Sequence, residues 1–414
     1  MNKIKKIILD NGLTIFCATD RTKHYFYASV ITKFGGMTKG FSLNGVEYII
    51  PEGLAHLMEH SLIDKSLYGN MFNYLNNKYV NFNGTTSKDK TTFYINTVEN
   101  YEENLVDLIK MVNTPIFNDN DLEDIKKPIY EEIKRSKDNR FKNINDAIDK
   151  CMYKNILYTS NVGTEDSIKD IDANFLKLCH DIFYQPKNQI IVLCGNVDIT
   201  KCKKIIEETY NSLNRKNIDY KLLEYDEPSE VNKREDTIID NKNEELVVME
   251  YKLDLKDFTP YEKVKLTFYV RHFLKYNFDD GSEIYNFMKD NKYAIYSINY
   301  DYHDFDKFMI ISLSCFTKEV NIFKEKVLEI FEKLPYDLEE FNIWKKNSIV
   351  EIILRNENPN HILFPYMENL LLYGYDDFDK VSDIESFNID EYLNLLRKID
   401  FSQYAIVNRK NEEA

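Results

Sequence analysis

The sequence has little cysteine, and its cysteines show no pattern of a disulfide or metal site. Six occur among 414 residues, and no two of them stand in a C-x-x-C pair. A chain of this length with so few cysteines is not built on a disulfide framework of the kind that small secreted domains need. We therefore expect reduced thiols that fill space in the cores of a cytoplasmic protein.

Long apolar runs and an excess of basic residues are also missing. No stretch reaches the roughly 18 apolar residues of a membrane span. Asp10 and Asn11 interrupt the N-terminal segment too early for a signal peptide. Lysine and arginine number 54 against 69 aspartates and glutamates, which gives a formal net charge of −15. Because nucleic-acid binding needs a basic face, we expect no nucleic-acid partner. The lack of an apolar span leads us to expect no membrane partner.

What remains is typical of a soluble globular protein. Hydrophobic residues make up 43% of the chain and charged residues 30%, and the length is enough for two or three domains. Segments with strand and helix patterns alternate throughout. Among them we expect helices over 53–66 and 120–140, a hairpin over 80–97, and a fully buried strand in the apolar run 190–194.

A change in composition marks a domain boundary. Residues 214–243 are polar and highly charged and include Pro228, as is common in linkers. The sequence therefore predicts a first domain over 1–213, a linker over 214–243 and a second domain over 244–414.

The two halves share a pattern of short segments. Asn-Lys-Tyr precedes an expected strand pair at 77–79 and again at 291–293. A Lys-Lys pair leads to Glu-Ile on an expected helix at 126–133 and again at 345–352. The two members of each pair are separated by similar lengths of chain, which indicates a duplicated unit. We expect an α+β protein of two similar domains.

A short histidine-containing motif, His56-Leu57-Met58-Glu59-His60, lies in the first half. On a helix, both histidines and Glu59 share one face, and the apolar residues fall on the other. Two imidazoles one turn apart can bind one metal ion, and the carboxylate between them can reach a water on that ion. The pattern H-x-x-E-H is also an inverted metallopeptidase signature. The alternative is a polar, solvated helix face without a metal.

A third protein ligand has to come from another element, and Glu132 is the candidate. Glu131 competes for the role, but its side chain points about 100° away on a helix. Glutamates on helices are usually solvated, so this position alone is a weak signal. Pro128 in the same segment indicates a kink or a helix start. In the second half His272 stands alone, and we expect it to be structural.

With these residues in place, the sequence resembles the family of pitrilysin, insulin-degrading enzyme and mitochondrial processing peptidase. Glu132 follows the histidine motif at a spacing typical of that family. The resemblance covers most of residues 6–205 and implies two similar domains, each a mostly antiparallel sheet packed against helices. The length resembles that of small bacterial members, which look most like one subunit of a processing-peptidase dimer. The other matching segments are 9–13, 53–55, 163–168 and 183–188.

The resemblance implies a role for each matching residue. His56, His60 and Glu132 would bind Zn²⁺, and Glu59 would be the general base. Asn83-Gly84-Thr85 stands where the family has an edge-strand motif, to which a substrate peptide adds as an extra strand. The alternative for Asn83 and Gly84 is a simple turn or bulge.

Two positions depart from the family pattern. The family often has a helper glutamate seven residues before the ligand glutamate, and Ile125 stands there, with Asp124 and Glu123 adjacent. Either a neighbour takes over this role or the helper is absent. The family also uses an arginine and a tyrosine seven residues apart in the second half, where this chain has Lys289 and Tyr296. Lysine cannot replace arginine in bidentate recognition.

The expected function is therefore that of a zinc endopeptidase that cleaves peptides or leader segments inside an enclosed chamber. The lysine favours a heterodimer in which a related subunit supplies the arginine and tyrosine pair, with a self-sufficient homodimer as the alternative. The rival hypothesis from another class is a non-catalytic structural or binding subunit of a processing-peptidase-like complex. The intact histidine motif disfavours that rival.

Overall fold

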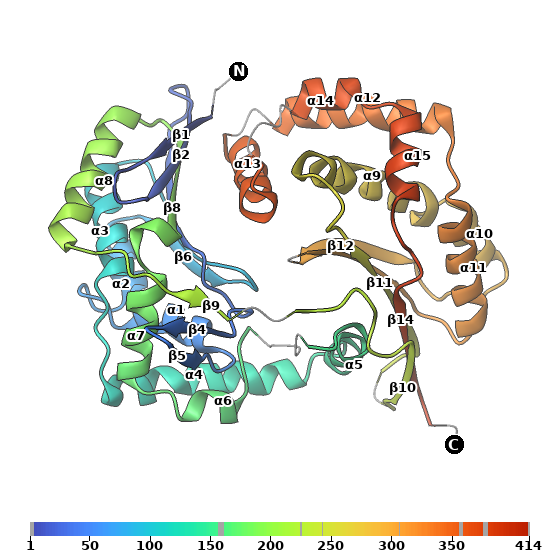
Figure 1. The fold of residues 1–414 in the computed structure, drawn as a ribbon, viewed down its shortest axis with the longest axis horizontal. Coiled ribbons are helices and arrows are strands. Elements are labelled where there is room, and N and C mark those ends of the chain that lie inside the picture. Colours follow the sequence, from blue (N-terminus) through green and yellow to red (C-terminus); the bar gives the residue numbers. More distant parts are fainter. Residues whose placement is uncertain are drawn as a thin grey trace. The chain divides into compact units, whose positions relative to one another are not determined.

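The chain folds into two compact units that draw on different parts of the sequence. The computed structural model describes residues 4–155, 161–223, 226–241, 243–305, 307–355, 359–375 and 380–412. The first unit contains residues 1–138, 159–224 and 358–364, and the second contains 139–158, 225–357 and 365–414. Both units combine helices with a sheet (Figure 1).

The first unit is built on a six-stranded sheet with the order β1-β2-β8-β3-β7-β6. Only β2 and β8 pair in parallel, and every other neighbouring pair is antiparallel. The central strands β3 and β8 are buried along their whole length; both are mostly apolar, and β8 contains the continuous apolar run 190–194. The strands are β1 (Lys5–Ile8), β2 (Thr14–Thr19), β3 (Phe26–Thr32), β6 (Asn81–Thr86), β7 (Thr91–Thr97) and β8 (Gln189–Gly195).

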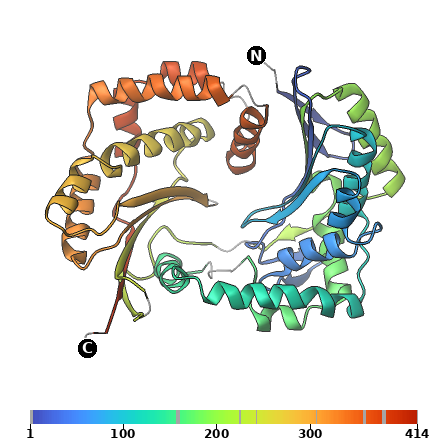
Figure 2. The same cartoon turned by 180° about the vertical axis from the view of Figure 1, so that it is seen from behind.

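Helices gather on one face of this sheet. Both views place α3 and α8 on that face (Figures 1 and 2), and α1 packs against β6, β7 and α4. The helices are α1 (Leu54–Asp64), α2 (Met71–Asn76), α3 (Tyr101–Asn113), α4 (Asp119–Lys137), α6 (Glu165–Lys169), α7 (Ala173–Phe183), α8 (Ile199–Leu213) and the 3₁₀ turn η1 (Pro186–Asn188). A small sheet adds β4 (Gly40–Leu43), β5 (Val46–Ile49) and β9 (Lys221–Leu222).

The second unit is built on a five-stranded sheet with the order β10-β14-β11-β13-β12. Here β10 and β14 pair in parallel and the other neighbours are antiparallel. The strands are β10 (Glu235–Ile239), β11 (Leu246–Asp254), β12 (Asn299–Phe305), β13 (Phe308–Cys315) and β14 (Tyr404–Lys410). The remaining helices of the chain are α5 (Lys142–Met152), α9 (Pro260–Phe278), α10 (Glu283–Asp290), α11 (Val320–Lys333), α12 (Leu338–Arg355), α13 (Pro359–Tyr373), α14 (Lys380–Ser386) and α15 (Ile389–Arg397).

The α+β class and the duplication predicted from the sequence are confirmed. The order α1-α2-β6-β7-α3-α4 in the first half returns as α9-α10-β12-β13-α11-α12 in the second. The turn between helix and strand also repeats, with left-handed backbone at Tyr79 and at Lys292, where φ is 58° and 60°. These two residues are one position out of register with the Asn-Lys-Tyr repeat of the sequence. The predicted hairpin is the β6–β7 pair, and the apolar run 190–194 lies in β8.

The boundaries of the units differ from the domain ranges expected from composition. Residues 139–158, including α5, group with the second unit because β14 and β11 hold them. The buried guanidinium of Arg409 donates to the carbonyl of Arg140. Lys252 and Glu227 form a buried ion pair of 2.5 Å, and Glu227 also accepts from backbone amides at 154 and 155.

The expected linker 214–243 is partly regular structure. Strand β9 lies in it and belongs to the small sheet of the first unit, whereas β10 belongs to the sheet of the second. Residues 224–225 and 242 of this segment lie outside the described residues. All six cysteines are buried and free, which agrees with the prediction that they are thiols that fill space in the cores. None of the helices in the described ranges has both the length and the hydropathy to cross a membrane.

The start of α1 depends on close backbone contact at Gly53. This residue caps the helix with φ of 81° and ψ of −5°, a conformation that costs other residues about 1–2 kcal/mol. A Cβ on Gly53 would lie 2.5 Å from the carbonyl oxygen of Val162. The Ser167 hydroxyl donates to the carbonyl of Glu52 at 2.9 Å and holds the same two segments together. The chain can therefore enter α1 in this way only with glycine at position 53.

We expect Gly53→Ala to lower the free energy of unfolding by more than the about 1–2 kcal/mol of left-handed backbone, because the steric clash adds to it. Gly45→Ala is the matched control, since Gly45 has φ of 82° but nothing within 4 Å of an added Cβ. Urea titrations followed by circular dichroism measure both variants. Equal losses in the two would contradict the contact described at Val162.

Candidate functional site

Helix α1 presents the histidine motif because its apolar side is fixed in the core. Leu54, Leu57 and Met58 have no exposed surface. The opposite face carries His56 and His60, which are both half-buried. Their rings lie 4.6 Å apart at a steep angle, one turn above the other. The sequence predicted this division of the helix, and packing holds the two imidazoles in place.

Helix α4 brings Glu132 to the same place. Its buried face consists of isoleucines at 125, 129 and 133, and Glu132 stands beside the last of them. Pro128 lies inside α4, which continues on both sides of it, so of the two expected outcomes the helix start is wrong. Lys65, just after α1, bridges to Asp121 on α4 at 2.7 Å. Glu131 is exposed.

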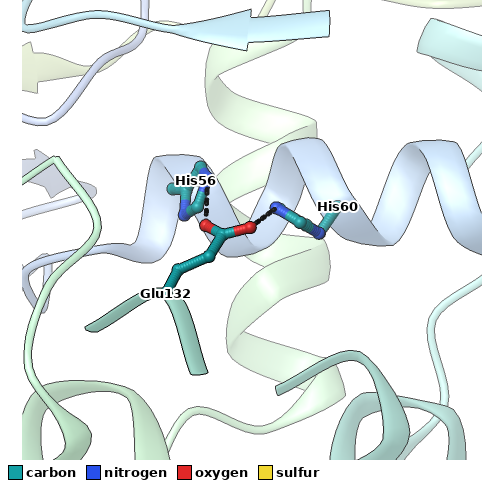
Figure 3. A group of neighbouring side chains, drawn as sticks. All are labelled: His56, His60 and Glu132. Atoms are coloured by element: carbon teal, nitrogen blue, oxygen red, sulfur yellow. Dashed lines mark ion pairs between the residues drawn. The ribbon is translucent and has the colours of Figure 1, made fainter. Parts of the chain in front are cut away.

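The three predicted metal ligands converge on one point (Figure 3). His56 Nε2 lies 3.6 Å from Glu132 Oε2, and His60 Nε2 lies 4.0 Å from Glu132 Oε1. Each residue offers one ligand atom, and these atoms all lie within 4.8 Å of one another. Within the described ranges, no other group of histidine, cysteine and carboxylate side chains comes together in this way.

The spacing and chemistry of these atoms fit a zinc ion. Both separations exceed the usual range of a hydrogen bond. Tetrahedral zinc with bonds of about 2.0–2.1 Å would hold its ligand atoms about 3.4 Å apart, close to the two distances found. Two imidazole nitrogens and a carboxylate oxygen are also a donor set that zinc accepts. His56 Nδ1 is buried and has no hydrogen-bond partner in the described part of the chain.

The pKa shifts of His56 and His60 are consistent with a cation bound between these residues and Glu132. Burial lowers the pKa of His56 to about 4, and the neighbouring His60 adds to this effect. Burial also acts to lower the pKa of His60, but Asp64, Glu132 and Glu59 together outweigh burial and raise it. His56 is therefore neutral at pH 7 and has a lone pair to offer. The carboxylates around His60 favour positive charge at that point, whether from a proton or a metal.

Glu59 is not one of the three clustered ligands, and its carboxylate contacts strand β6. The residue is only 7% exposed, and Thr86 Oγ1 donates a hydrogen bond of 2.5 Å to its Oε2. Burial raises the pKa of Glu59, although the Thr86 hydrogen bond and His60 oppose this effect. A buried carboxylate with a raised pKa, beside a candidate metal site, has the properties of a general base.

Strand β6 reaches this carboxylate only because residue 84 is glycine. A Cβ there would lie 2.8 Å from Ile63 Cδ1 and 3.0 Å from Glu59 Oε1. The strand is regular and pairs with β7 from Asn81 to Thr86, so Asn83 and Gly84 form neither a turn nor a bulge. Its other side has no strand partner among the described residues. The edge of the sheet therefore passes directly beside Glu59.

Thr86 is the site residue that sequence reasoning missed. It lies two residues after Gly84 and so points to the same face of β6, toward α1. That alternation was visible in the sequence, but the distance between β6 and α1 was not. The helper carboxylate is absent from the cluster: Ile125 is buried, whereas Asp124 pairs with Lys127 and Glu123 with Lys126.

The two candidate residues of the second half each have contacts of their own. Lys289, in the last turn of α10, donates to the hydroxyl of Tyr285 at 3.3 Å. Tyr296 is 56% exposed and packs edge-on against Phe316. Both belong to the second unit. Their expected role in substrate binding remains a prediction.

His272 lies on α9, the second unit's counterpart of the helix that carries the histidine motif. It is buried and stacks on Trp344 with ring centroids 4.5 Å apart. Burial lowers the pKa of His272 to about 4, so it is a neutral aromatic component of the core, which agrees with the structural role expected for it.

Two family models of M16 peptidases match most of this chain. Residues 50–164 match the family described as insulinase (peptidase family M16), and residues 170–346 match the one described as the peptidase M16 inactive domain. A Bacillus subtilis protein named zinc protease YmfH is 30% identical over 193 residues, which are 46% of this chain and 45% of the relative. That match therefore spans less than half of the relative's length.

Solved structures share the fold over almost the whole chain. A protein of Alicyclobacillus acidocaldarius described as M16-like superposes with a TM-score of 0.89 and 17% identity, covering 99% of both chains. The periplasmic protease PqqL of Escherichia coli has a TM-score of 0.77 and 12% identity. It matches 99% of this chain but 48% of its own length, so PqqL contains about twice as much chain.

We expect Glu132→Ala to abolish stoichiometric zinc binding, because it removes the one ligand that does not come from α1. Glu131→Ala is the matched control, as the neighbouring glutamate is exposed and lies outside the cluster. Zinc content after dialysis, measured by inductively coupled plasma mass spectrometry, distinguishes the two. A full complement of zinc in Glu132→Ala would remove Glu132 from the ligand set.

Proposed function

Because the chain belongs to the insulinase family of peptidases, family M16, we propose that it is a zinc-dependent endopeptidase acting on peptides. One observation carries the proposal: His56, His60 and Glu132 converge on a point that fits zinc, and Glu59 on the same helix is buried and oriented by Thr86. The zinc protease name of the Bacillus subtilis relative supports it.

Zinc bound there would polarise the scissile carbonyl and acidify a water. Glu59 would accept a proton from that water as the water oxygen bonds to the carbonyl carbon. When the C–N bond breaks, Glu59 would return the proton to the departing amine nitrogen. Burial raises the pKa of Glu59, so the protonated form is accessible and the same carboxyl can serve as base and then as acid.

Thr86 would act through Glu59. Its hydroxyl holds Oε2, so proton transfer falls to Oε1, the oxygen nearest to Gly84. A base that is already oriented loses little freedom in the transition state. Thr86 is therefore a positioning residue in this proposal.

The substrate would bind as an added strand. The free side of β6 offers the backbone N–H and C=O of Gly84, whose amide donates to the Asn83 side chain in this structure, and an extended peptide can pair with such an edge through main-chain hydrogen bonds. Pairing of this kind places the peptide backbone beside Glu59, because Gly84 has no side chain to keep them apart. It would select extended peptides and unfolded segments, and among them leader peptides are candidates.

We also propose that the active form includes a second chain. PqqL is about twice as long as the part of it that this chain matches. Lys289 stands where an arginine would give bidentate recognition, which a lysine cannot provide. A related subunit that supplies an arginine and tyrosine pair would complete the site, and a homodimer using Lys289 and Tyr296 is the alternative. The rival function, a non-catalytic structural or binding subunit, is favoured by the missing helper glutamate at Ile125, by this lysine and by the match of residues 170–346 to an inactive domain.

The direct test of the proposed base is Glu59→Gln. We expect it to retain zinc and to reduce peptide cleavage about 10²–10⁴-fold, the range for loss of a general base. Mass spectrometry of an unstructured peptide library measures cleavage, and Glu131→Gln is the control for loss of one nearby charge. Cleavage at the wild-type rate would exclude Glu59 as the base. A wild-type chain that binds zinc but cleaves only with a related subunit would favour the heterodimer.

Thr86→Val should lower kcat by about 10–100-fold, because it removes a hydrogen bond to a carboxylate worth about 1.5–3 kcal/mol. We expect zinc affinity to stay at the wild-type value, and Thr86→Ser to restore most of the rate through its hydroxyl. Steady-state kinetics on one cleaved peptide separate these effects. If Thr86→Val and Thr86→Ser were equally impaired, the hydroxyl would have no role.

A further inference from the structure

Asp64 holds a carboxylate beside the second histidine of the motif. It is the last residue of α1, four positions after His60, and its Oδ2 lies 3.9 Å from His60 Nδ1. The other oxygen, Oδ1, accepts a hydrogen bond of 2.8 Å from Asn70 Nδ2. Asn70 is itself fixed, since its Oδ1 caps α2 by accepting from the amide of Asn73. The position of Asp64 is therefore set from outside the cluster.

The two nitrogens of His60 face different carboxylates. Nε2 faces Glu132 in the cluster, and Nδ1 faces Asp64. To bind a metal through Nε2, a neutral imidazole has to carry its proton on Nδ1. A carboxylate beside Nδ1 favours that tautomer, holds the ring in place and makes Nε2 more basic. His56 differs, because its Nδ1 has no hydrogen-bond partner in the described residues.

We propose that Asp64 is a positioning residue for zinc, which acts by fixing the tautomer and orientation of His60. This inference rests on the zinc site of the proposed function. Within that site, α4 contributes the ligand Glu132 but no carboxylate toward His60, since Ile125 is buried and Asp124 and Glu123 pair with lysines of their own helix. Asp64 is the carboxylate on the free side of the ring.

A surface ion pair without any role in zinc binding would have the same geometry as the His60–Asp64 pair. The experiment has to distinguish these two cases. The side chains of His60 and Asp64 are 22% and 31% exposed, and exposed pairs of this kind contribute little to stability. The separation of 3.9 Å is also longer than a hydrogen bond. A surface pair predicts a small change in unfolding and no change in zinc affinity, whereas a positioning residue predicts the reverse.

The test is the zinc affinity of Asp64→Asn, measured on the full chain by competition with a colorimetric chelator. Asparagine has the same shape and can still accept from Asn70, but its NH₂ group then faces His60 Nδ1. We expect the Kd for zinc to rise about 10–100-fold, the usual effect of removing such a partner. The thermal unfolding midpoint of the metal-free protein should not change.

Three variants make the result specific. Asp64→Glu should restore much of the affinity, because it returns a carboxylate to the same side of His60. Asn70→Ser should weaken zinc binding by a smaller factor, since serine still caps α2 but cannot hold Asp64. Glu131→Gln removes one nearby negative charge without contact to His60 and should bind zinc like the wild type.

The outcomes distinguish the inference from the function on which it rests. Wild-type zinc binding with a weakened Asp64→Asn supports both. Wild-type binding with an unchanged Asp64→Asn overturns the role of Asp64 and leaves the zinc site intact. A wild-type chain that binds no zinc overturns both. Equal weakening in Asp64→Asn and Glu131→Gln reduces the effect to general charge and also overturns the role of Asp64.

Discussion

The packing of α1 is the constraint on which the candidate site depends. Its apolar face is fully buried against the first unit's core, and its start is fixed by the contact between Gly53 and Val162. Once this helix is in place, both histidines, Glu59 and Asp64 have set positions. The other parts of the site come from the elements that touch it, with Glu132 on α4 and Gly84 and Thr86 on β6. A metal site built on packed helices is held with more precision than one on loops.

Periodicity was sufficient to predict the parts of the site that lie on α1. The 3.6-residue repeat places His56, Glu59 and His60 on one side, and the structure has them there. Glu132 needed the family resemblance, because a glutamate on a charged helix has no distinguishing pattern. Neither periodicity nor the family resemblance predicted a role for Thr86. Its role depends on how closely β6 approaches α1, which is a tertiary distance, and Asp64 likewise depends on Asn70.

The boundaries of the two units likewise could be predicted only in part from the sequence. The duplicated order of elements was visible from short repeated segments, and it is confirmed. The assignment of α5 was not visible, because it depends on tertiary packing of this helix against β10, β11 and β14. The Arg409 guanidinium and the Lys252–Glu227 pair hold this region in the second unit, and an isolated arginine or lysine in a sequence gives no sign of burial. The two halves then differ in chemistry, since the counterpart of α1 has only His272, stacked on Trp344.

The central claim is that two histidines of α1 and a glutamate of α4 bind zinc. The most direct measurement is X-ray absorption at the zinc K-edge, on the full chain loaded with one equivalent of zinc. The account predicts nitrogen and oxygen neighbours at about 2.0–2.1 Å, with the multiple-scattering pattern of two imidazoles. Sulfur neighbours at about 2.3 Å, or a shell without imidazole, would contradict it.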